Sequence, residues 1–417
     1  MTFVEKIKKS DLCIGCGYCA SFSSRQMEYD RNGFLVPSSA GPELTRSEEA
    51  LVKAACPGKN AEDVFCTDDA TPEVAVDHLW GPYTTALTGF ATHAETRHTG
   101  SSGGVLTALS RYLVETGQVD GVLSTTYDEA YPVGTSSEVT DDADVLLRAG
   151  GSKYCPASPL ATLDYIRDNP GTYAVVGRPC DIATLRRAIK AGDPVGDRIA
   201  YLFSFFCAGT PSDTGNRKLV SDLGVRKFED LDYLRHRGNG WPGDTVAKLK
   251  DGSEKTCTYN QSWGGILRNY THNLCKICTD GIGEQADIVA ADAWYGDDEG
   301  YPVFEESDGR SLIMARTPIG EKLLRAAMAD GWLATEAFDL RQLDQMQVGQ
   351  TARRLQLLDR VRAFRAMGLP TPRYRQAALR QYARGVPLSR RIMNFGATVR
   401  RIIRKRMKKA PKTRRIS

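Results

Sequence analysis

The sequence predicts a mixed α/β protein in three parts: a small cysteine-rich module, an α/β core and a basic helical extension. Four cysteines mark the first part, three of them in the string CIGCGYC and one in the later CPG. From about residue 80, strand-like and helix-like segments alternate, which is typical of α/β folds. After Asp359 the chain contains no acidic residue, and this sets the basic extension apart.

Size and composition place the chain among globular proteins. Its 417 residues suffice for two or three domains, and 41% hydrophobic with 25% charged residues is an ordinary composition. The start MTFVEKIKKSD lacks the apolar stretch of a secretory signal, and no run of about 18 apolar residues suggests a membrane span. Eleven cysteines, several in C-x2-C pairs, fit metal ligation in a reducing compartment better than disulfides. We therefore expect a cytoplasmic protein.

Cys13, Cys16 and Cys19 have the C-x2-C-x2-C spacing of a ferredoxin-type 4Fe–4S site. This spacing lets one tight loop reach three corners of a cubane cluster. Gly15 and Gly17 stand between the ligands, where the backbone must approach the cluster closely. A structural zinc site is the alternative, although zinc sites usually contain two separate C-x2-4-C pairs.

The fourth ligand of this site is predicted to be Cys56, because the proline that follows it turns the chain away from a helix. Cys66 is the rival for this position. Between the ligands, Asn32-Gly33 predicts a hairpin turn and residues 45–58 predict a short helix. We expect residues 1–70 to form a ferredoxin-type module with one cluster.

The core is expected to contain at least some parallel strands, because its strands and helices alternate. Strands are predicted at residues 86–92, 119–127, 173–177 and 198–207, and helices at 101–117, 180–192, 319–331 and 340–367. Between about residues 225 and 265 the turns GNGWPG and DGS indicate antiparallel strands.

A second group of cysteines suggests a further site. Cys275 and Cys278, in CKIC, can bind one metal or two corners of a cluster, and two more thiolates are then needed. Cys180 and Cys207 each stand at a predicted strand end or turn; the alternative is that they are small buried apolar residues. The other two core cysteines, Cys155 and Cys257, have no partner by spacing and are expected to be structural.

The string HTGSSGG lies at a predicted strand-to-helix turn. Its residues Ser101, Ser102, Gly103 and Gly104 bring hydroxyls and backbone N–H groups to a helix start, which is a natural anion site. An ordinary helix cap is the alternative, since the string is neither a dinucleotide fingerprint nor a P-loop.

Two further polar positions are candidates for proton transfer. Asp292, followed closely by Trp294 in ADAW, stands at a predicted strand end and either holds a proton or substrate group or caps a turn. His236 lies between arginines and is expected to be structural.

The chain resembles the beta subunit family of coenzyme F420 hydrogenase/dehydrogenase. The resemblance runs from about residue 80 to 375 and rests on HTGSSGGVLTALSRYLVETGQVDGV, AGGSKY, VVGRPCDIATLRRA, FFCAGTPS, RGNGWPG, CKICTDGIGEQADIVAADAW and RAMGLPTP, in that order. It implies an α/β flavin-binding region at 80–165 and a second region at 166–375. Related members include flavin-dependent reductases of chlorophyll-type tetrapyrroles and bacterial proteins linked to polysaccharide loci.

The resemblance also implies cofactors and their ligands. It implies FAD, with the diphosphate held at Ser101–Gly104 and at Thr107. Lys153 is implied as a charge partner of the phosphate or the flavin ring and, with Asp292, as a catalytic candidate; a solvated surface lysine is the alternative. It further implies a second 4Fe–4S cluster, with ligands Cys180, Cys207, Cys275 and Cys278.

The last segment, residues 376–417, is predicted to be a basic amphipathic tail. Nineteen of the 55 Lys and Arg residues lie from Arg360 onward, whereas the preceding part has 36 of them against 51 acidic residues. One helical face is predicted to carry the apolar residues Ile392, Phe395, Val399, Ile402 and Ile403, with Lys and Arg residues around it. This is typical of helices that lie on anionic lipid. A solvated or partner-docking tail is the alternative. Nucleic acid is not expected as a partner, because the tail lacks a recognition fold. Peripheral attachment to the inner face of the membrane is thus compatible with a cytoplasmic location.

Taken together, these observations predict an iron–sulfur flavoprotein oxidoreductase. Its clusters would move single electrons from ferredoxin or another redox protein, and its FAD would serve a two-electron partner, either coenzyme F420 or an unsaturated organic substrate. Two alternatives remain: an electron-transfer subunit without a substrate site, and an accessory protein of cell-surface polysaccharide biosynthesis.

Overall fold

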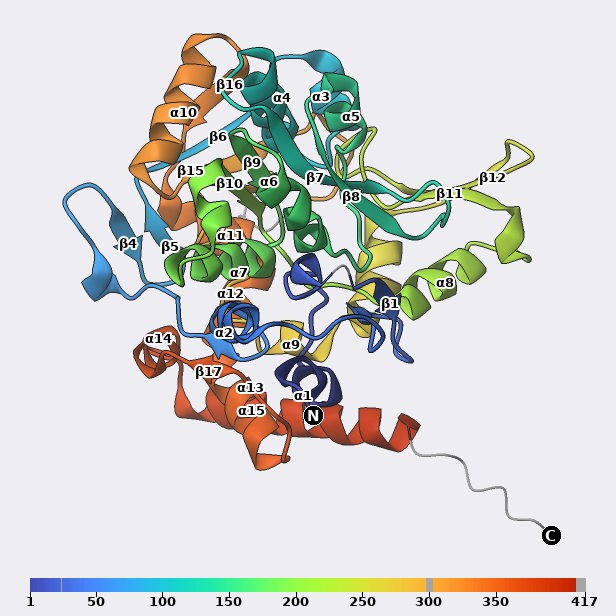
Figure 1. Cartoon of the computed structure of the whole chain (residues 1–417), viewed down its shortest axis with the longest axis vertical. Coiled ribbons are helices and arrows are strands. Elements are labelled where there is room, and N and C mark those ends of the chain that lie inside the picture. The colour runs from blue at the N-terminus through green and yellow to red at the C-terminus, as the bar shows by residue number, and fades with distance from the viewer. Residues whose placement is uncertain (24, 298–302, 410–417) are drawn as a thin grey trace.

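An eight-stranded mixed sheet forms the centre of the computed structural model, which describes residues 1–23, 25–297 and 303–409 (Figure 1). In spatial order the strands are β16 (Leu333–Ala337), β6 (Thr85–Ala91), β15 (Ser311–Ala315), β14 (Ile288–Asp292), β10 (Ile199–Phe205), β9 (Tyr173–Val176), β7 (Gly121–Tyr127) and β8 (Thr135–Thr140). Strands β14, β10, β9 and β7 are parallel, and antiparallel strands extend the sheet on both sides. The expected mixed α/β class is confirmed.

The central strands are apolar on both faces, since helices cover both. All five residues of β15 are buried, as are the first four of β14. One face packs against α4 (Val105–Glu115) and α10 (Pro318–Ala329). The other packs against α6 (Leu163–Asp168) and α7 (Pro179–Lys190). The strands and helices predicted around these positions are confirmed.

The N-terminal residues pack directly on the α7 side of the core. They form α1 (Phe3–Lys9), the hairpin β1 (Met27–Tyr29) and β2 (Leu35–Pro37), α2 (Arg46–Ala55) and β3 (Asn60–Ala61). The hairpin and the short helix were expected, and Thr45 and Glu48 form the capping box of that helix. Arg187 of α7 donates to the carbonyl oxygen of Ala55 at 2.9 Å, which ties the two parts together. The division of the chain at residue 70 stays a prediction.

Two smaller sheets flank the core. The strands β4 (Ala75–Asp77) and β5 (Gly81–Tyr83) pair in a hairpin. The expected antiparallel segment forms a three-stranded sheet of β11 (Leu231–Arg235), β12 (Thr245–Leu249) and β13 (Glu254–Cys257), beside α8 (Asp213–Asp222). These elements project from the sheet as a separate lobe in Figure 1.

Helices dominate the C-terminal part. They are α11 (Leu343–Met346), α12 (Val348–Leu355), α13 (Leu357–Ala366), α14 (Gln376–Tyr382) and α15 (Leu388–Lys409). The helical segment expected at 340–367 is therefore interrupted at Gln347 and Gln356. Within the segment expected to be a tail, α14 buries Leu379 and Tyr382 in the main core, and only α15 lies on the surface as a long helix. Ile402 of α15, expected on the exposed apolar face, is instead buried against this core. Residues 410–417 lie outside the described part.

The described helices include none that is long and apolar enough to cross a membrane.

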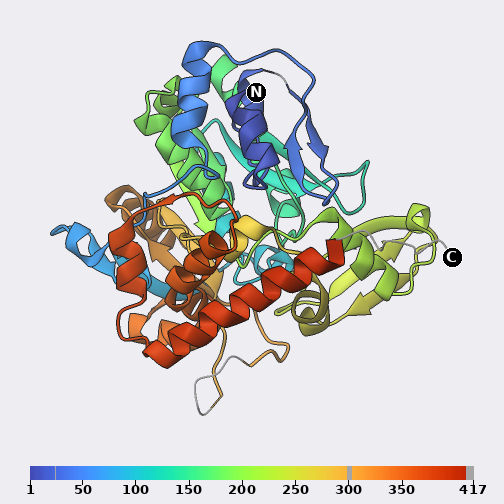
Figure 2. The same cartoon turned by 90° about the horizontal axis from the view of Figure 1, so that it is seen from below.

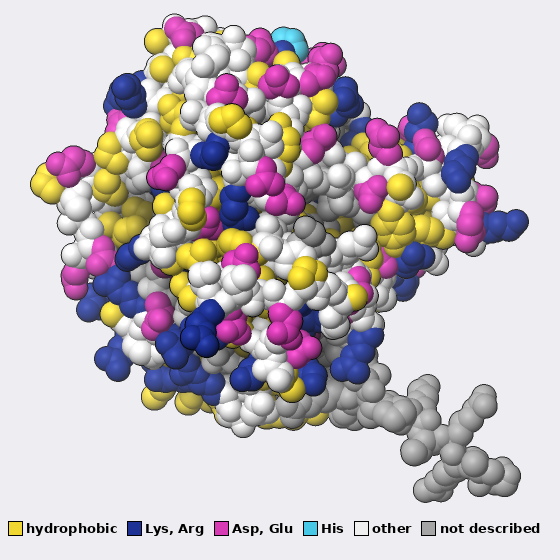
Figure 3. Space-filling view, viewed as in Figure 1, with side chains coloured by type: hydrophobic (Ala, Val, Ile, Leu, Met, Phe, Trp, Pro, Cys, Tyr) yellow, Lys and Arg dark blue, Asp and Glu magenta, His cyan; other side chains and the backbone are white. Residues whose placement is uncertain are grey.

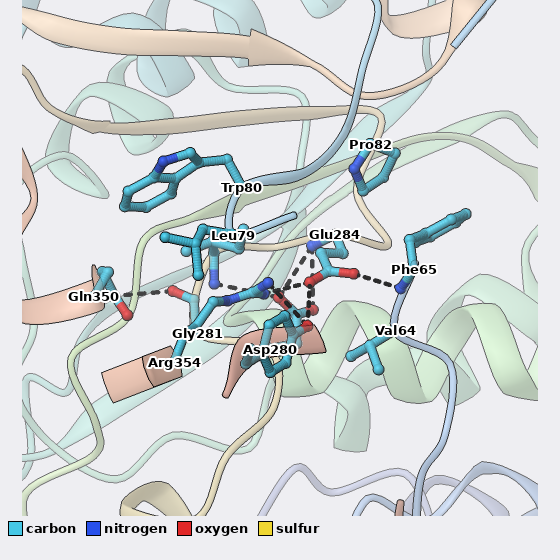
Figure 4. Close-up of polar contacts among 12 residues, drawn as sticks. Val64, Phe65, Leu79, Trp80, Pro82, Asp280, Gly281, Glu284, Gln350 and Arg354 are labelled. Carbon is cyan, nitrogen blue, oxygen red and sulfur yellow. Dashed lines mark hydrogen bonds and ion pairs between the residues drawn. The ribbon is translucent and has the colours of Figure 1, made fainter. Parts of the chain in front are cut away.

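A buried network of charges joins several of these elements (Figure 4). The side chains of Glu284 and Arg354 form an ion pair, and both are almost fully buried. Glu284 also accepts a hydrogen bond from the backbone N–H of Phe65 at 2.8 Å, and Arg354 donates to the hydroxyl of Tyr382 at 2.9 Å. The pair thus holds the N-terminal segment, the loop before β14 and two C-terminal helices in one arrangement.

We expect Arg354→Met to lower the free energy of unfolding by about 3–5 kcal/mol, because it leaves the Glu284 carboxylate buried without its partner. The double variant Arg354→Met, Glu284→Gln should recover part of this loss. Urea unfolding followed by circular dichroism measures both. Arg341→Met serves as the control, since Arg341 is 91% exposed and its pair with Asp339 is worth little. Equal stability of Arg354→Met and wild type would contradict the prediction.

Candidate functional site

The candidate site lies at the carboxyl ends of the parallel strands, the edge at which α/β proteins usually bind ligands. Strand β9 leads into Arg178 and Cys180, β10 leads into Cys207, and β14 ends at Asp292. Strand β6 runs in the same direction and leads toward Ser101. Residues that are distant in the sequence therefore meet at one edge of the sheet.

The thiols of Cys13, Cys16, Cys19 and Cys56 surround one small cavity of about 40 Å³; we call them the N-terminal thiol set. Gly15 and Gly17 have φ angles of 72° and 88°, a backbone region that favours glycine, and this lets the loop curl around the cavity. Cys66, the rival for the fourth position, does not line this cavity and interacts instead with Arg375 and Asp69.

The surroundings of the N-terminal thiol set suit a metal cluster. Burial raises the pKa of Cys13 to about 12 and raises that of Cys19 well above its usual value. Without a positive charge beside them, these thiols are therefore protonated and neutral. The positive charge of iron would favour the thiolates. The backbone N–H groups of Gly15 and Gly58 act in the same direction, because they lower the pKa of Cys13 and Cys56. The donor set thus fits the expected cluster.

A second cavity, of about 60 Å³, is lined by Cys180, Cys207, Cys275 and Cys278, which we call the second thiol set. Helix α9 (Asn273–Lys276) carries Cys275, and the chain reaches Cys278 just beyond it. The backbone N–H of Thr210 donates to the Cys275 sulfur at 3.5 Å. Burial raises the pKa of Cys207 to about 11 and that of Cys278 to about 12. The structure therefore brings together all four cysteines of the expected second site.

Across the described residues, no three Cys, His, Asp or Glu side chains are close enough to hold a single metal ion. The two thiol sets instead line the cavities just described.

A larger cavity of about 330 Å³ opens beside the second thiol set, and we call it the sheet-edge cavity. Cys207, Gly209 and Thr210 line both this cavity and the smaller one, so the two spaces adjoin at these residues. Ser101, Thr107 and the start of α4 line its far side. The cavity is thus long enough to connect the second thiol set with a helix N-terminus.

Residues of the turn before α4 have two roles: some contacts fix the turn to the sheet, and some residues line the cavity. The Ser102 hydroxyl bonds to the carbonyl oxygen of Arg310 at 2.9 Å, and the N–H of Gly103 donates to the Ser311 hydroxyl at 2.9 Å. Gly103 packs so closely that a Cβ atom would lie 2.6 Å from the carbonyl oxygen of Gly89. These contacts fix the turn to the sheet, and Gly103 does not line the cavity.

Ser101, Ser102 and Gly104 of this turn line the cavity, as does Thr107 in the first turn of α4. Gly104 caps the helix with a φ angle of 72°. The N–H groups of the first turn have no partner within the helix and carry the positive end of its dipole. This end of the cavity is therefore suited to an anion such as a diphosphate.

Lys153 lies in the same cavity and is half-buried, so the expected alternative of a fully solvated surface lysine does not hold. It follows α5 (Ala143–Arg148), and its ammonium donates to the carbonyl oxygens of Ala149 at 2.6 Å and Gly150 at 2.9 Å. Burial lowers the pKa of Lys153 to about 8. A half-buried cation in this position would stabilise negative charge on a ligand in the cavity.

Asp292 is held by a ring of donors. Arg237 binds it through two nitrogens at 2.9 Å, and the indole N–H of Trp241 donates at 2.8 Å. Arg237 also donates to the carbonyl oxygen of Ser101 and is almost fully buried. This arrangement favours a structural and electrostatic role of Asp292 over proton transfer.

His236 is buried, and its Nε2 atom lies 2.8 Å from the Asn216 side-chain oxygen. Burial lowers the pKa of His236 to about 3, so it is neutral near pH 7 and fits the expected structural role. Of the two unpaired core cysteines, Cys155 lines the sheet-edge cavity, whereas Cys257 ends β13 away from it.

Sequence reasoning missed two cavity residues. Arg237 and Arg178 are buried guanidiniums that line the cavity, and Arg178 pairs with the buried Asp181 at 2.8 Å. The available signal was their position at glycine- and proline-containing turns, RGNG and GRP, next to predicted strand ends.

Two family models match the chain and together cover more than half of it. Both describe the beta subunit of coenzyme F420 hydrogenase/dehydrogenase: residues 86–163 match the model of its N-terminal part, and residues 171–340 match the model of its C-terminal part. The chain belongs to this family. The expected relationship is therefore confirmed. The matched residues include the second thiol set and all lining residues of the sheet-edge cavity except Gln347 and Gln350.

Relatives within this family are oxidoreductase subunits. The chain is 28% identical to the coenzyme F420 hydrogenase subunit beta of Methanococcus voltae, over 62% of this chain and 86% of that protein. It is 29% identical to the F420-dependent formate dehydrogenase 1 subunit beta of Methanococcus maripaludis, over 57% of this chain and 58% of that protein. The family protein described here is accordingly an oxidoreductase of this type, with a role in electron transfer.

A solved structure supports the fold. One chain of the F420-reducing NiFe hydrogenase complex from Methanosarcina barkeri aligns with a TM-score of 0.56 and 21% identity, covering 71% of this chain and 98% of that chain.

The lowered pKa of Lys153 predicts how the free energy of unfolding depends on pH. Its pKa falls from 10.5 to about 8 on folding, so between these values the unfolded chain binds more protons and the free energy of unfolding rises with pH. Below pH 8 the buried charge destabilises the fold. We expect Lys153→Met to stabilise the cofactor-free chain at pH 7 by on the order of 3 kcal/mol, and to lose this advantage as the pH approaches 10.5.

Urea unfolding at pH 7 and pH 10 measures this effect, with the exposed Lys190→Met as the control. A loss of stability in Lys153→Met at pH 7 would show that the hydrogen bonds of the ammonium outweigh its burial.

Proposed function

We propose that this family member is an iron–sulfur flavoprotein that passes electrons between a one-electron redox protein and a two-electron partner. In this proposal the N-terminal and second thiol sets each hold a 4Fe–4S cluster, and the sheet-edge cavity holds FAD. The partner is coenzyme F420 or an unsaturated organic substrate, and the redox protein is a ferredoxin or a similar carrier.

One observation carries the proposal: the cavity of the second thiol set adjoins the sheet-edge cavity. The two cavities share the lining residues Cys207, Gly209 and Thr210. A cluster exchanges single electrons, whereas a flavin exchanges pairs or a hydride. A protein that converts one kind of transfer into the other needs the two groups side by side. The shared lining supports this arrangement.

The cavity residues support FAD over a ligand without phosphate. Ser101, Thr107 and the first turn of α4 provide hydroxyl and N–H donors for a diphosphate, and the half-buried Lys153 adds a positive charge. Bound FAD would supply two-electron chemistry, which no side chain in the cavity provides. The protein's part is to bind the diphosphate, orient the ring and place positive charge beside it.

The names of the relatives favour coenzyme F420 as the two-electron partner. F420-dependent hydrogenase, formate dehydrogenase and sulfite reductase are named among them. They also favour an electron-transfer role over an accessory role in polysaccharide biosynthesis.

Iron content tests the two-cluster assignment. We expect anaerobically purified wild type to contain about eight irons per chain and one FAD, because each cubane carries four irons. Cys56→Ser and Cys180→Ser should each retain about half of the iron, since each removes one ligand of a different set. Cys66→Ser should retain all of it, because Cys66 lies outside both thiol sets. Metal analysis and visible spectra measure these contents.

A wild-type chain without iron and flavin would overturn the proposal, and loss of iron in Cys66→Ser would overturn the ligand assignment. Turnover of coenzyme F420 with reduced viologen dye by the chain alone supports a substrate site of its own. Flavin reduction without F420 turnover would instead assign the chain as an electron-transfer subunit.

The outer face of α15 supports contact with an anionic membrane. Leu388, Ile392 and Met393 are 64–70% exposed, and Ile403 is 43% exposed. Leu388 and Ile392 are one turn apart, and Ile403 follows three turns later on the same side. Figure 3 shows hydrophobic side chains along the lower edge of the molecule and Lys and Arg side chains above them, where Figure 1 places α13, α14 and α15. This combination is typical of helices that lie on anionic lipid.

We expect the triple variant Leu388→Gln, Ile392→Gln, Ile403→Gln to bind vesicles of phosphatidylglycerol and phosphatidylcholine at least about tenfold more weakly, since it removes the apolar contact. Salt should weaken wild-type binding. Co-sedimentation measures both, with Ile319→Gln on α10 as the control, since Ile319 is 45% exposed. Equal binding of the triple variant and wild type would remove the membrane role.

A further inference from the structure

A wide cleft of about 2250 Å³ lies between the lobe with α8 and the C-terminal helices. Lys218 and Asp222 of α8 line one side of it, and Thr398, Arg401 and Ile402 of α15 line the other. Figure 2 shows α15 running across this side of the molecule toward that lobe. Pockets for small ligands usually measure about 300–1,000 Å³, so this space is suited to part of a macromolecule.

The cleft is strongly basic. Among the described residues that line it, eight are Lys or Arg and two are Asp. One of the two acids, Asp222, pairs with Lys218 within the cleft. The net charge of the lining is therefore positive and favours an acidic partner; we call this surface the basic cleft.

Three guanidiniums gather in the basic cleft without a carboxylate between them. The pKa of Arg360 is lowered to about 10. Burial is the main cause, and the positive charges of Arg353 and Arg401 lower it further. No ion pair joins Arg353, Arg360 or Arg401 to a carboxylate of the described residues. Mutual repulsion of this kind costs stability in the free protein and is relieved when an anionic surface binds.

The basic cleft reaches the redox site at two points. Cys275 of the second thiol set lines it, and the Arg353 guanidinium donates to the carbonyl oxygen of Cys207 at 2.9 Å. Tyr259, Trp263 and Trp294 line both the cleft and the sheet-edge cavity. A partner in the cleft would therefore contact the protein next to the second thiol set.

We propose that the basic cleft docks the acidic face of a one-electron carrier protein, beside the second thiol set. This inference rests on the proposed function and adds the docking surface. Two reduced carriers dock in turn, and each is oxidised by one electron. The two electrons, together with two protons from solvent, reduce the two-electron partner. A flat bilayer does not enter a concave cleft, and one small anion does not fill it.

Charge reversal tests the docking surface in the reconstituted holoprotein. A reduced, strongly acidic ferredoxin is mixed with it, and the rate of flavin reduction is followed by stopped flow at low and high salt. Arg401 and Arg404 of α15 both line the basic cleft. We expect Arg401→Glu, Arg404→Glu to slow the reaction at least about tenfold at low salt and to abolish the fall of the rate with salt that wild type shows. Arg401→Lys, Arg404→Lys keeps the charge and should react like wild type within about twofold.

The matched control is Lys190→Glu, Lys322→Glu, which makes the same change in net charge at exposed positions of α7 and α10 outside the cleft. Its rate should stay within about twofold of wild type. Reduced methyl viologen, a small cation, should reduce the Arg401→Glu, Arg404→Glu variant at least as fast as wild type, which shows that its cofactors are intact.

Each outcome bears on one claim. Equal slowing in the control and the cleft variant would mean that only net charge matters and would overturn the docking site. A raised KM for coenzyme F420 with unchanged ferredoxin kinetics would assign the cleft to the small anion and overturn it as well. Failure of viologen to reduce wild-type holoprotein would instead sink the proposed function.

Discussion

The buried pair of Glu284 and Arg354 is the constraint on which the site depends. Two charges this deeply buried are tolerated only because each is surrounded by further partners. Asp280 accepts the N–H of Glu284 at 3.0 Å, and Arg316 donates to the carbonyl oxygen of Ile282 at 2.7 Å, so the loop after Cys278 is fixed from several sides. Gln350 extends the network to the carbonyl oxygen of Cys207 at 3.1 Å. The ion network therefore holds two cysteines of the second thiol set in place, although it contributes no ligand itself.

The three cavities adjoin one another, and each shares lining residues with the next. Ile14 and Pro57 line both the cavity of the N-terminal thiol set and that of the second thiol set. Cys207 then lines both the second cavity and the sheet-edge cavity. This order suits a relay, because electron transfer is favoured by short separations and by a fixed protein framework. The matched residues include all four cysteines of the second thiol set and most of the lining of the sheet-edge cavity, whereas the N-terminal thiol set and α15 lie outside them.

Local patterns predicted much of this architecture, because they report local physics. Apolar runs such as 198–207 gave strands, and the ligand spacing of Cys13 to Cys19 depends on one loop alone. Contacts that depend on folding were less accessible. Nothing near Arg237 in the sequence indicates that it binds Asp292 across 55 positions, and the burial of α14 follows from packing on distant residues of the core. Lys153 shows the same limit, since only the fold places a lysine after a glycine turn in the lining of a cavity.

Helix α15 has three sides with different surroundings, and this explains how one segment can serve two contacts. Arg391 pairs with Asp359 of α13, which fixes the helix to the body of the protein. Arg401 lines the basic cleft, whereas Ile403, two residues later, is turned by about 200° and belongs to the exposed apolar side. Lipid contact through the apolar side would therefore leave the basic cleft accessible to a carrier protein. Membrane attachment and electron delivery are thus compatible on a single helix, and separate substitutions on its two sides can distinguish them.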